Sequence, residues 1–147
     1  MGIYERHRNS QTKNQCAPIP LPEKPTISTR DVSILIPTIN TPDAFTECMR
    51  LWLANEPKEI IIVTIPRDLQ RVKELLAPVG DTSTPISVFT VPKPGRRAQM
   101  SLALDKATGS IITYVDDDTY WPTNKVLPHL LAGFHDPAVG GVMGRQR

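Results

Sequence analysis

Four short, nearly continuous apolar runs constrain the fold of this chain more than any other feature. The runs span residues 32–37, 59–64, 86–91 and 110–115. Helices are expected between and after them, at residues 42–54, 67–77, 96–107 and 124–134. Short apolar strands that alternate with helices predict an α/β fold in which a parallel sheet is covered on both faces.

The length of the chain is that of one domain. It has 147 residues, 39% of them hydrophobic, which is enough to bury a single core. Residues 1–30 are polar and rich in proline, without a sustained period. We therefore expect residues 1–30 to form a disordered or extended lead-in and residues 31–147 to form the domain.

Charge and cysteine content exclude several classes of protein. With 17 basic and 15 acidic residues the net charge is +2, so no overall field favours nucleic acid. Cys16 and Cys48 have neither zinc-ligand nor disulfide-framework spacing. No apolar stretch reaches the roughly 18 residues of a membrane span. We expect no nucleic-acid partner, no transmembrane segment in this chain and a cytoplasmic location.

Two helical patterns carry specific expectations. Thr41 has the side chain of a helix N-cap, and Trp52 falls in the apolar stripe that follows, which places it in the core or, alternatively, against a base. In the helix expected at residues 96–107, Met100, Ala103, Leu104 and Ala107 are spaced as a buried stripe.

Three consecutive carboxylates, Asp116, Asp117 and Asp118, follow the last apolar run. Side chains alternate in an extended segment, so we expect Asp116 and Asp118 on one face and Asp117 on the other. Carboxylates this close repel each other, and a hard cation such as Mg²⁺ or Mn²⁺ would neutralise them. The alternative is a solvated acidic turn.

Two further polar groups are expected at the same edge, because ligands of open parallel sheets bind beyond the carboxyl ends of the strands. Residues 37–40 follow the first strand and could hold a nucleobase or form a helix-capping turn. Arg96 and Arg97 begin a helix, where cations oppose the macrodipole. A bound diphosphate would offset that arrangement, and simple solvation of the arginines is the alternative. Cation, diphosphate and base together describe a nucleotide.

In order and spacing, residues 31–38, 95–100 and 116–118 resemble the N-terminal half of family 2 glycosyltransferases. The resemblance runs from about residue 31 to the end and is closest to the processive polysaccharide synthases, the hyaluronan, chitin and cellulose synthase group. It implies a GT-A fold, a Rossmann-like and mostly parallel sheet, here truncated at its C-terminal side. It also implies binding of a nucleoside diphosphate sugar, usually a UDP-sugar, through Mg²⁺ or Mn²⁺ held at a DxD motif.

The resemblance implies a role for each matching residue. Asp118 would bind the metal, Asp116 would contact the nucleotide and help to hold the metal, and Thr38 would line the nucleobase pocket. Arg96 and Arg97 take the positions of the family's Gly-Lys-Arg segment and would contact the phosphates. The other expected nucleotide-sugar contacts are Pro37, Asn40, Thr64 and Asp117.

Two departures from the family pattern limit these expectations. Where the second strand ends, the family usually has an aspartate that contacts the base, whereas this chain has Thr64, which could replace only part of that hydrogen bonding. The family's acceptor-side general base, its Gln-x-x-Arg-Trp segment and its membrane helices would lie beyond Arg147. We therefore expect a donor-binding half, with no catalytic residue assigned and no activity alone.

The leading hypothesis is thus a partial family 2 glycosyltransferase domain that binds a sugar nucleotide. As part of a longer synthase it would act on a growing glycan at the cytoplasmic face of a membrane. The main alternative is a non-catalytic nucleotide-binding or interaction module on the same scaffold. A nucleotidyltransferase is disfavoured, because residues 38–42 are not the glycine- and lysine-rich loop expected after the first strand.

Overall fold

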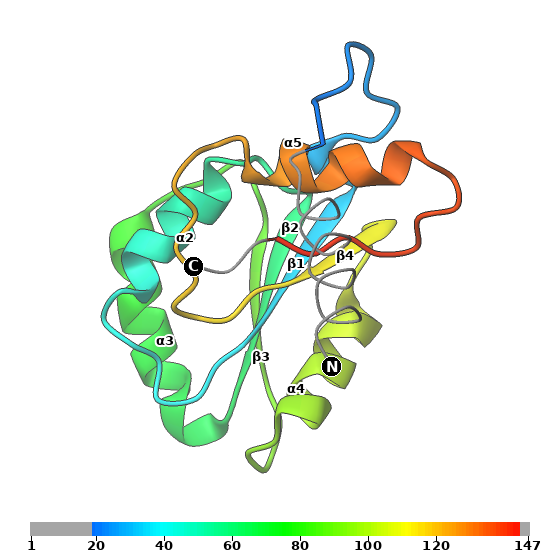
Figure 1. The fold of residues 1–147 in the computed structure, drawn as a ribbon. Helices are drawn as coiled ribbons and strands as arrows, with labels where there is room; N and C mark the ends of the chain where they lie inside the picture. Colours follow the sequence, from blue (N-terminus) through cyan, green and yellow to red (C-terminus); the bar gives the residue numbers. More distant parts are fainter. Residues whose placement is uncertain (1–18, 145–147) are drawn as a thin grey trace, which may run out of the picture.

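The computed structural model describes residues 19–144, which are built around a sheet of four parallel strands (Figure 1). The strands are β1 (Val32–Pro37), β2 (Glu59–Thr64), β3 (Ile86–Thr90) and β4 (Ile111–Tyr114). They lie in the order β3-β2-β1-β4. In register, Leu35 of β1 is opposite Ile61 of β2 on one side and Tyr114 of β4 on the other. The parallel α/β sheet expected from the four apolar runs is confirmed.

Helices cover both faces of this sheet. α2 (Phe45–Leu53) and α3 (Leu69–Leu76) lie on one face, and α4 (Arg96–Lys106) lies on the other (Figure 1). α5 (Val126–Leu131) contacts η1 (Thr29–Asp31) and so lies near the amino end of β1. The remaining 3-10 helices are η2 (Pro66–Asp68), η3 (Ala77–Val79) and η4 (Ala132–His135).

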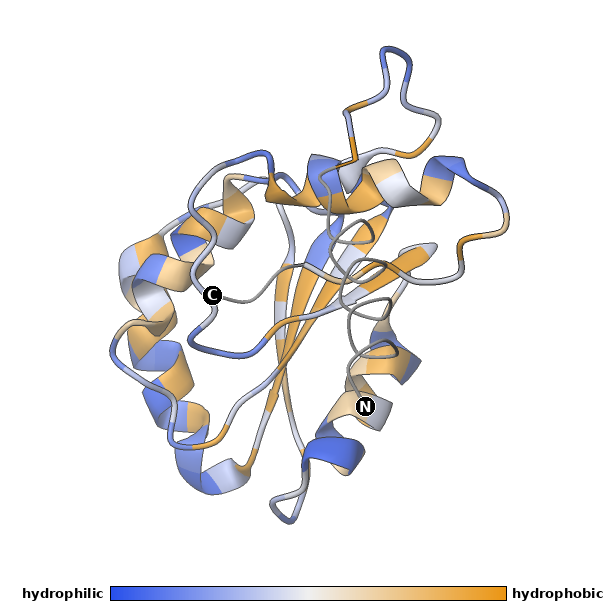
Figure 2. Cartoon of the chain, in the orientation of Figure 1, coloured by the Kyte–Doolittle hydropathy of each residue, from blue (hydrophilic) through white to orange (hydrophobic). Residues whose placement is uncertain are grey.

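The alternation of side chains along the strands divides the core into two parts. Ile34 of β1 packs in a cluster with side chains of α2, α3 and α5, whereas Leu35 packs in a second cluster with Ala103 of α4. β1 and β2 are mostly apolar (Figure 2) because both of their faces are buried. The apolar runs therefore reflect a sheet with two covered faces.

Of the two alternatives for Trp52, a place in the core or a position against a base, the structure shows the first. Its side chain is fully buried and meets the ring of Phe45 edge to face, with 5.8 Å between centroids. Its indole nitrogen donates to the carbonyl oxygen of Thr119 at 2.9 Å. The contact ties α2 to the segment that follows the three aspartates.

Two expectations about the helices are wrong in detail. Thr41 does not cap α2, which begins at Phe45 after a turn in which the Phe45 N–H donates to the Pro42 carbonyl. Leu104, expected in the buried stripe of α4, is 49% exposed, whereas Gln99 and Ala103 are buried. The buried face of α4 includes the polar side chain of Gln99, whose burial cannot be predicted from the spacing of apolar residues.

Gly109 allows β4 to enter the sheet close to β1. A Cβ at this position would lie 2.6 Å from the Ser33 hydroxyl oxygen and 2.7 Å from the Asp31 carbonyl oxygen. The Gly109 N–H instead donates to that hydroxyl at 2.8 Å. A larger residue would push the start of β4 away from β1.

Residues 1–18 of the expected lead-in lie outside the described residues. The described part, residues 19–31, ends in η1, whose Ser28 and Asp31 form a capping box. Ile27 in this segment packs against the core. Among the helices of residues 19–144, none combines the length and the apolar content needed to cross a membrane.

Candidate functional site

The strand order reverses at β1, with β2 and β3 on one side of it and β4 on the other. In open parallel sheets, the carboxyl ends of the strands at such a reversal form the usual ligand site. Thr38 directly follows β1, and Asp116 lies two residues after β4. The residues that the sequence singled out after these two strands are therefore placed side by side.

Thr38 connects the two strand ends. Its side chain is 2% exposed, and its hydroxyl donates to an oxygen of Asp117 at 2.5 Å. The Thr38 hydroxyl oxygen also lies 2.8 Å from the Thr41 hydroxyl, which therefore donates to Thr38. The hydroxyl that was expected to cap α2 instead orients Thr38 toward the aspartates.

Asp117 is the aspartate of the three that points into the protein. Burial raises its pKa, the hydrogen bond from Thr38 lowers it in part, and the charges of Asp118 and Asp116 raise it further. The net effect is a raised pKa. Asp118 is exposed, and its charge also helps to raise the pKa of the buried Cys48 thiol, after the larger effect of burial.

Asp116 turns toward α4. One of its carboxylate oxygens accepts a hydrogen bond from the Arg96 guanidinium, and the two side chains form an ion pair. From Asp116 the chain makes a turn, in which the Thr119 N–H donates to the Asp116 carbonyl at 3.0 Å. The alternation expected for an extended segment thus ends before Asp117 and Asp118, because the strand has already ended at Tyr114.

A hollow of about 180 Å³ lies beside these groups. It is lined by Pro37, Thr38, Ile39, Arg96 and Gln99. Three of the residues expected to contact a nucleotide, Pro37, Thr38 and Arg96, therefore share one surface. Asp117 and Asp116 join it through their bonds to Thr38 and Arg96.

Three expected residues do not line this hollow. Arg97 is exposed and forms no ion pair with any part of the described chain. Asn40 is exposed and faces Arg67 and Asp68. Thr64 is fully buried, on the same side of β2 as Ile62 by strand alternation, and its hydroxyl has no hydrogen-bond partner within residues 19–144.

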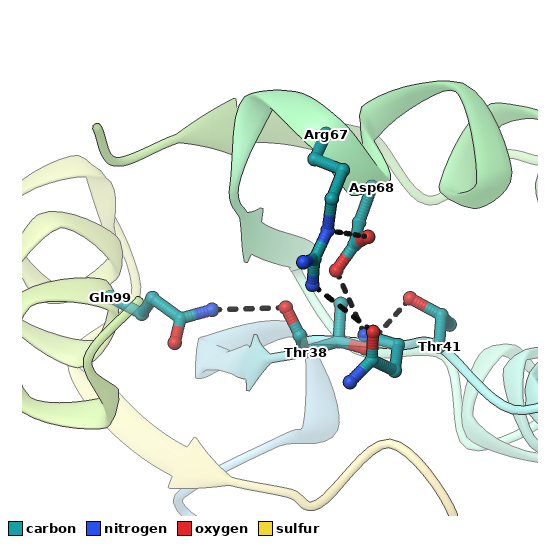
Figure 3. Close-up of polar contacts among 6 residues, drawn as sticks. Thr38, Thr41, Arg67, Asp68 and Gln99 are labelled. Carbon is teal, nitrogen blue, oxygen red and sulfur yellow. Dashed lines mark hydrogen bonds and ion pairs between the residues drawn. The ribbon is translucent and has the colours of Figure 1, made fainter. Parts of the chain in front are cut away.

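A polar network that the sequence did not lead us to expect lies at the end of β1 (Figure 3). Asn40 has a φ of 53°, in the left-handed region. Its N–H donates to an oxygen of Asp68 at 2.9 Å, and Arg67 bridges the other Asp68 oxygen and the Asn40 side chain at 3.2 Å each. The Asn40 N–H lowers the pKa of Asp68, burial opposes this, and Arg67 lowers it further.

Gln99 was not expected to contribute to the site, although it lies within residues 95–100, one of the segments that resemble family 2. Its amide nitrogen donates to the carbonyl oxygens of Thr38 at 3.0 Å and Val63 at 2.7 Å (Figure 3 shows the first). A polar residue one turn after Arg96 was the available signal. Its partners are backbone atoms of distant strands, which residue type does not reveal.

The donor atoms available for a cation are all carboxylate oxygens. They suit Mg²⁺ or Mn²⁺ by their hardness. Within residues 19–144, however, no group of three or more His, Cys, Asp or Glu side chains is arranged to hold a metal. The protein alone would therefore supply one or two ligands, and water or a bound phosphate would have to supply the others.

Comparison with known families gives these residues a context. The family model described as glycosyl transferase family 2 matches residues 33–147, which is more than half of the chain. The chain belongs to glycosyl transferase family 2. The match includes both ends of the candidate site, from Thr38 to the three aspartates.

Two fungal glycosyltransferases are similar to this chain. An NDP-glycosyltransferase of Aspergillus luteorubrus, ltbB, is 47% identical over 130 residues, which cover 88% of this chain and 32% of that protein. A type 2 glycosyltransferase of Zymoseptoria tritici is 39% identical over 131 residues, covering 88% of this chain and 27% of that protein. The chain spans about a quarter to a third of the length of these relatives.

A solved structure from an archaeon has a similar fold. A mannosyltransferase of Pyrobaculum calidifontis, in complex with GDP-Man and Mn²⁺, matches with a TM-score of 0.72 and 21% identity, over 92% of this chain and 41% of that one. The likeness supports the GT-A fold expected for a family 2 domain. None of these relatives is described as a processive synthase, so that closer resemblance stays a prediction.

Proposed function

We propose that this family 2 domain binds a nucleoside diphosphate sugar at the hollow beside the three aspartates. The observation that carries the proposal is the pair of contacts Thr38–Asp117 and Arg96–Asp116, which brings a polar strand end, a helix-terminal cation and the acidic trio to one place. Such a site offers separate partners to a base, a diphosphate and a cation.

Each residue then has a defined task. Pro37 and Thr38 form the wall against which the nucleobase lies, and Gln99 holds that wall by its bonds to two strand carbonyls. Arg96 supplies a guanidinium fork to the diphosphate, and Arg97 adds a second positive charge at the same helix end. Asp117 orients Thr38, while Asp116 and Asp118 face the cation.

A divalent metal fits this donor set. Asp116, Asp118 and the diphosphate would supply part of the oxygen ligands that Mg²⁺ or Mn²⁺ takes, and water would supply the rest. When bound, the metal would neutralise the charge on the leaving diphosphate. Mn²⁺ is the first metal to test, because the mannosyltransferase with the similar fold was solved with Mn²⁺.

The reaction that we propose for this family 2 site is glycosyl transfer. An acceptor hydroxyl oxygen bonds to the anomeric carbon, the bond from that carbon to the diphosphate breaks, and the hydroxyl proton passes to a base. We assign that base to no residue of this chain. The resemblance to processive synthases further suggests a growing glycan as the acceptor and polysaccharide synthesis as the outcome.

Two observations suggest different bases for the nucleotide. The resemblance suggests a UDP-sugar, whereas the mannosyltransferase with the similar fold binds GDP-Man. We propose UDP first, with GDP as the competitor in the same experiment. The chain has no carboxylate at the end of β2 to accept a base N–H, so the discrimination between the two is expected to be modest.

Isothermal titration calorimetry with UDP and Mn²⁺ tests the proposal. We expect UDP binding that depends on Mn²⁺ and weakens roughly tenfold or more, about 1.4 kcal/mol, in Asp118→Ala. Asp81→Ala removes an exposed carboxylate that precedes the amino end of β3, whereas the candidate site lies at the carboxyl ends of the strands, and is the matched control. The proposed metal site is contradicted if the affinity for UDP or GDP changes neither on addition of Mn²⁺ nor in Asp118→Ala.

Release of UDP from a UDP-sugar separates the two functional hypotheses. A chain that binds the donor and releases no UDP behaves as a binding module, whereas release above the rate in Asp118→Ala indicates donor chemistry. The two outcomes are distinguished by following free UDP over time with purified chain and Mn²⁺.

A further inference from the structure

The ion pair between Arg96 and Asp116 joins two residues that the proposed function assigns to different ligands. Arg96, at the first turn of α4, is assigned to the diphosphate, and Asp116, after β4, is assigned to the cation. In this structure the two side chains form an ion pair, in which the guanidinium Nη2 donates to Asp116 Oδ1. Their side chains are 63% and 47% exposed, so either can reach a ligand without unfolding of the domain.

This pairing leaves Asp116 with a cation already beside it. A guanidinium hydrogen-bonded to Oδ1 occupies one lone-pair direction, and its positive charge repels a second cation at the same oxygen. The cation site is therefore closed in part while Arg96 stays on Asp116. No third His, Cys, Asp or Glu among the described residues compensates for the lost ligand.

We propose that Arg96 is a stand-in cation that keeps the metal site closed until a diphosphate draws it away. The inference rests on the proposed function and adds an order to it. Arg96 lines the hollow together with Thr38 and Gln99, so a diphosphate in the hollow lies within reach of its guanidinium. Release of Asp116 then opens the metal site only when a donor is present.

The direction of the exchange follows from charge. A diphosphate offers several anionic oxygens, which can take both arms of the guanidinium fork, whereas the observed contact to Asp116 uses one nitrogen. Once Arg96 leaves, Asp116 is an uncompensated carboxylate close to Asp117 and Asp118, and the trio attracts a divalent cation. Diphosphate and metal therefore favour each other's binding, by the same factor in both directions.

Binding of Mn²⁺ without nucleotide isolates the role of the pair. Free Mn²⁺ is measured by electron paramagnetic resonance during titration of the full chain and its variants. We expect Arg96→Gln to bind Mn²⁺ about two- to fivefold more tightly than the unmodified chain, the range that a half-exposed ion pair supports. Arg30→Gln breaks another exposed ion pair, that of Arg30 with Glu56, which lies outside the candidate site, and we expect its Mn²⁺ affinity to change by less than about 1.5-fold.

A second substitution identifies the oxygen that is released. In Asp116→Asn the pair is already broken and the carboxylate is gone, so adding Arg96→Gln should give no further gain in Mn²⁺ affinity. Circular dichroism confirms that each variant is folded. The exchange is refuted if Arg96→Gln and Arg30→Gln bind Mn²⁺ equally, or if neither binds it at millimolar concentration.

Addition of UDP, and of GDP in parallel, completes the test. We expect the nucleotide to raise the Mn²⁺ affinity of the unmodified chain by a larger factor than that of Arg96→Gln, because the variant has no pair to break. Equal factors overturn the exchange. A chain that binds no nucleoside diphosphate in the presence of Mn²⁺ overturns the proposed function as well, and this outcome is distinct from equal Mn²⁺ affinities in the nucleotide-free titration.

Discussion

Asp68 is a single buried carboxylate that holds the backbone after β1 in its conformation. Asn40 occupies the left-handed region, which costs free energy for a residue other than glycine. The Asp68 oxygen that accepts the Asn40 N–H stabilises this conformation, and Arg67 pairs with the other oxygen (Figure 3). The position of Thr38, two residues earlier, depends on the same turn.

Asp68→Asn is expected to lower the free energy of unfolding by about 1 kcal/mol at pH 7. The variant keeps an oxygen for the Asn40 N–H and loses the charge that strengthens both bonds. Urea unfolding measures the loss. Asp43→Asn is the control, because Asp43 is an exposed aspartate in the loop that contains Asn40 and forms a surface ion pair with Arg71. It should change the stability by roughly less than 0.5 kcal/mol.

The pH dependence of this difference has a definite sign. The folded pKa of Asp68 lies below its ordinary value of 3.8, chiefly because of the hydrogen bond from Asn40. Its contribution to stability is therefore fully present above 3.8 and is lost as the pH falls through the folded pKa. The free energies of unfolding of the unmodified chain and of Asp68→Asn should converge below pH 3.8. A difference between them that stays constant down to the lowest pH at which the chain folds contradicts this role for Asp68.

At the scale of elements, α4 is attached to the sheet by a polar side chain as well as by apolar packing. Gln99 is 2% exposed and reaches the carbonyl oxygens of Thr38 and Val63, at the ends of two adjacent strands. The Val63 carbonyl also accepts the Thr38 N–H at 3.0 Å. The Thr38 carbonyl accepts its hydrogen bond from the Gln99 amide. α4 therefore carries both Arg96, which faces the aspartates, and the amide that positions the strand ends.

Gln99→Leu is expected to destabilise the chain by about 1–3 kcal/mol, because it leaves a buried carbonyl without its donor. It should also weaken nucleotide binding, since Gln99 and Thr38 line the same hollow. Urea unfolding and calorimetry with UDP and Mn²⁺ measure the two effects. Gln70→Leu makes the same chemical change on the exposed face of α3, where the Gln70 amide donates a hydrogen bond to Glu74, and is the matched control. Equal stabilities of the two variants would show that Gln99 does not hold α4 to the sheet.

At the scale of the whole molecule, the candidate site bridges parts of the chain that are far apart in sequence. Thr38 and Asp117 are separated by 79 residues. Arg96 lies between them in the sequence and begins α4, the helix on the opposite face of the sheet from α2 and α3 (Figure 1). A ligand held by all of these groups binds the folded chain and not the unfolded one. Ligand binding should therefore stabilise the entire domain.

Thermal unfolding with UDP and Mn²⁺ together is expected to show this linkage. At a nucleotide concentration of 100 times its dissociation constant, the gain in stability is about 2.7 kcal/mol. For a domain of this size the gain corresponds to a rise in Tm of roughly 10 °C. The rise with both ligands should exceed the sum of the rises with UDP alone and Mn²⁺ alone. A simple sum, or no rise in the presence of both, contradicts coupled binding at one site.

The amino-acid sequence by itself determined the class of fold and the residues that follow each strand. Apolar periods are local properties, so β1 and β2 were predicted at their observed bounds, and β3 and β4 to within one residue at each end. Helix ends were less accurate, because the Thr41 hydroxyl bonds to Thr38 rather than capping α2. The location of Thr38, Arg96 and the aspartates at strand and helix ends followed from the same local patterns.

Only the tertiary structure decided which of these residues meet. The order β3-β2-β1-β4 places β4 beside β1, and this pairing allows Thr38 to reach Asp117 and Arg96 to reach Asp116. The burial of Thr64 and Gln99 and the role of Asp68 depend on the same arrangement. Strand order and side-chain contacts are set by the packing of segments distant in sequence, and no local period or residue type specifies them.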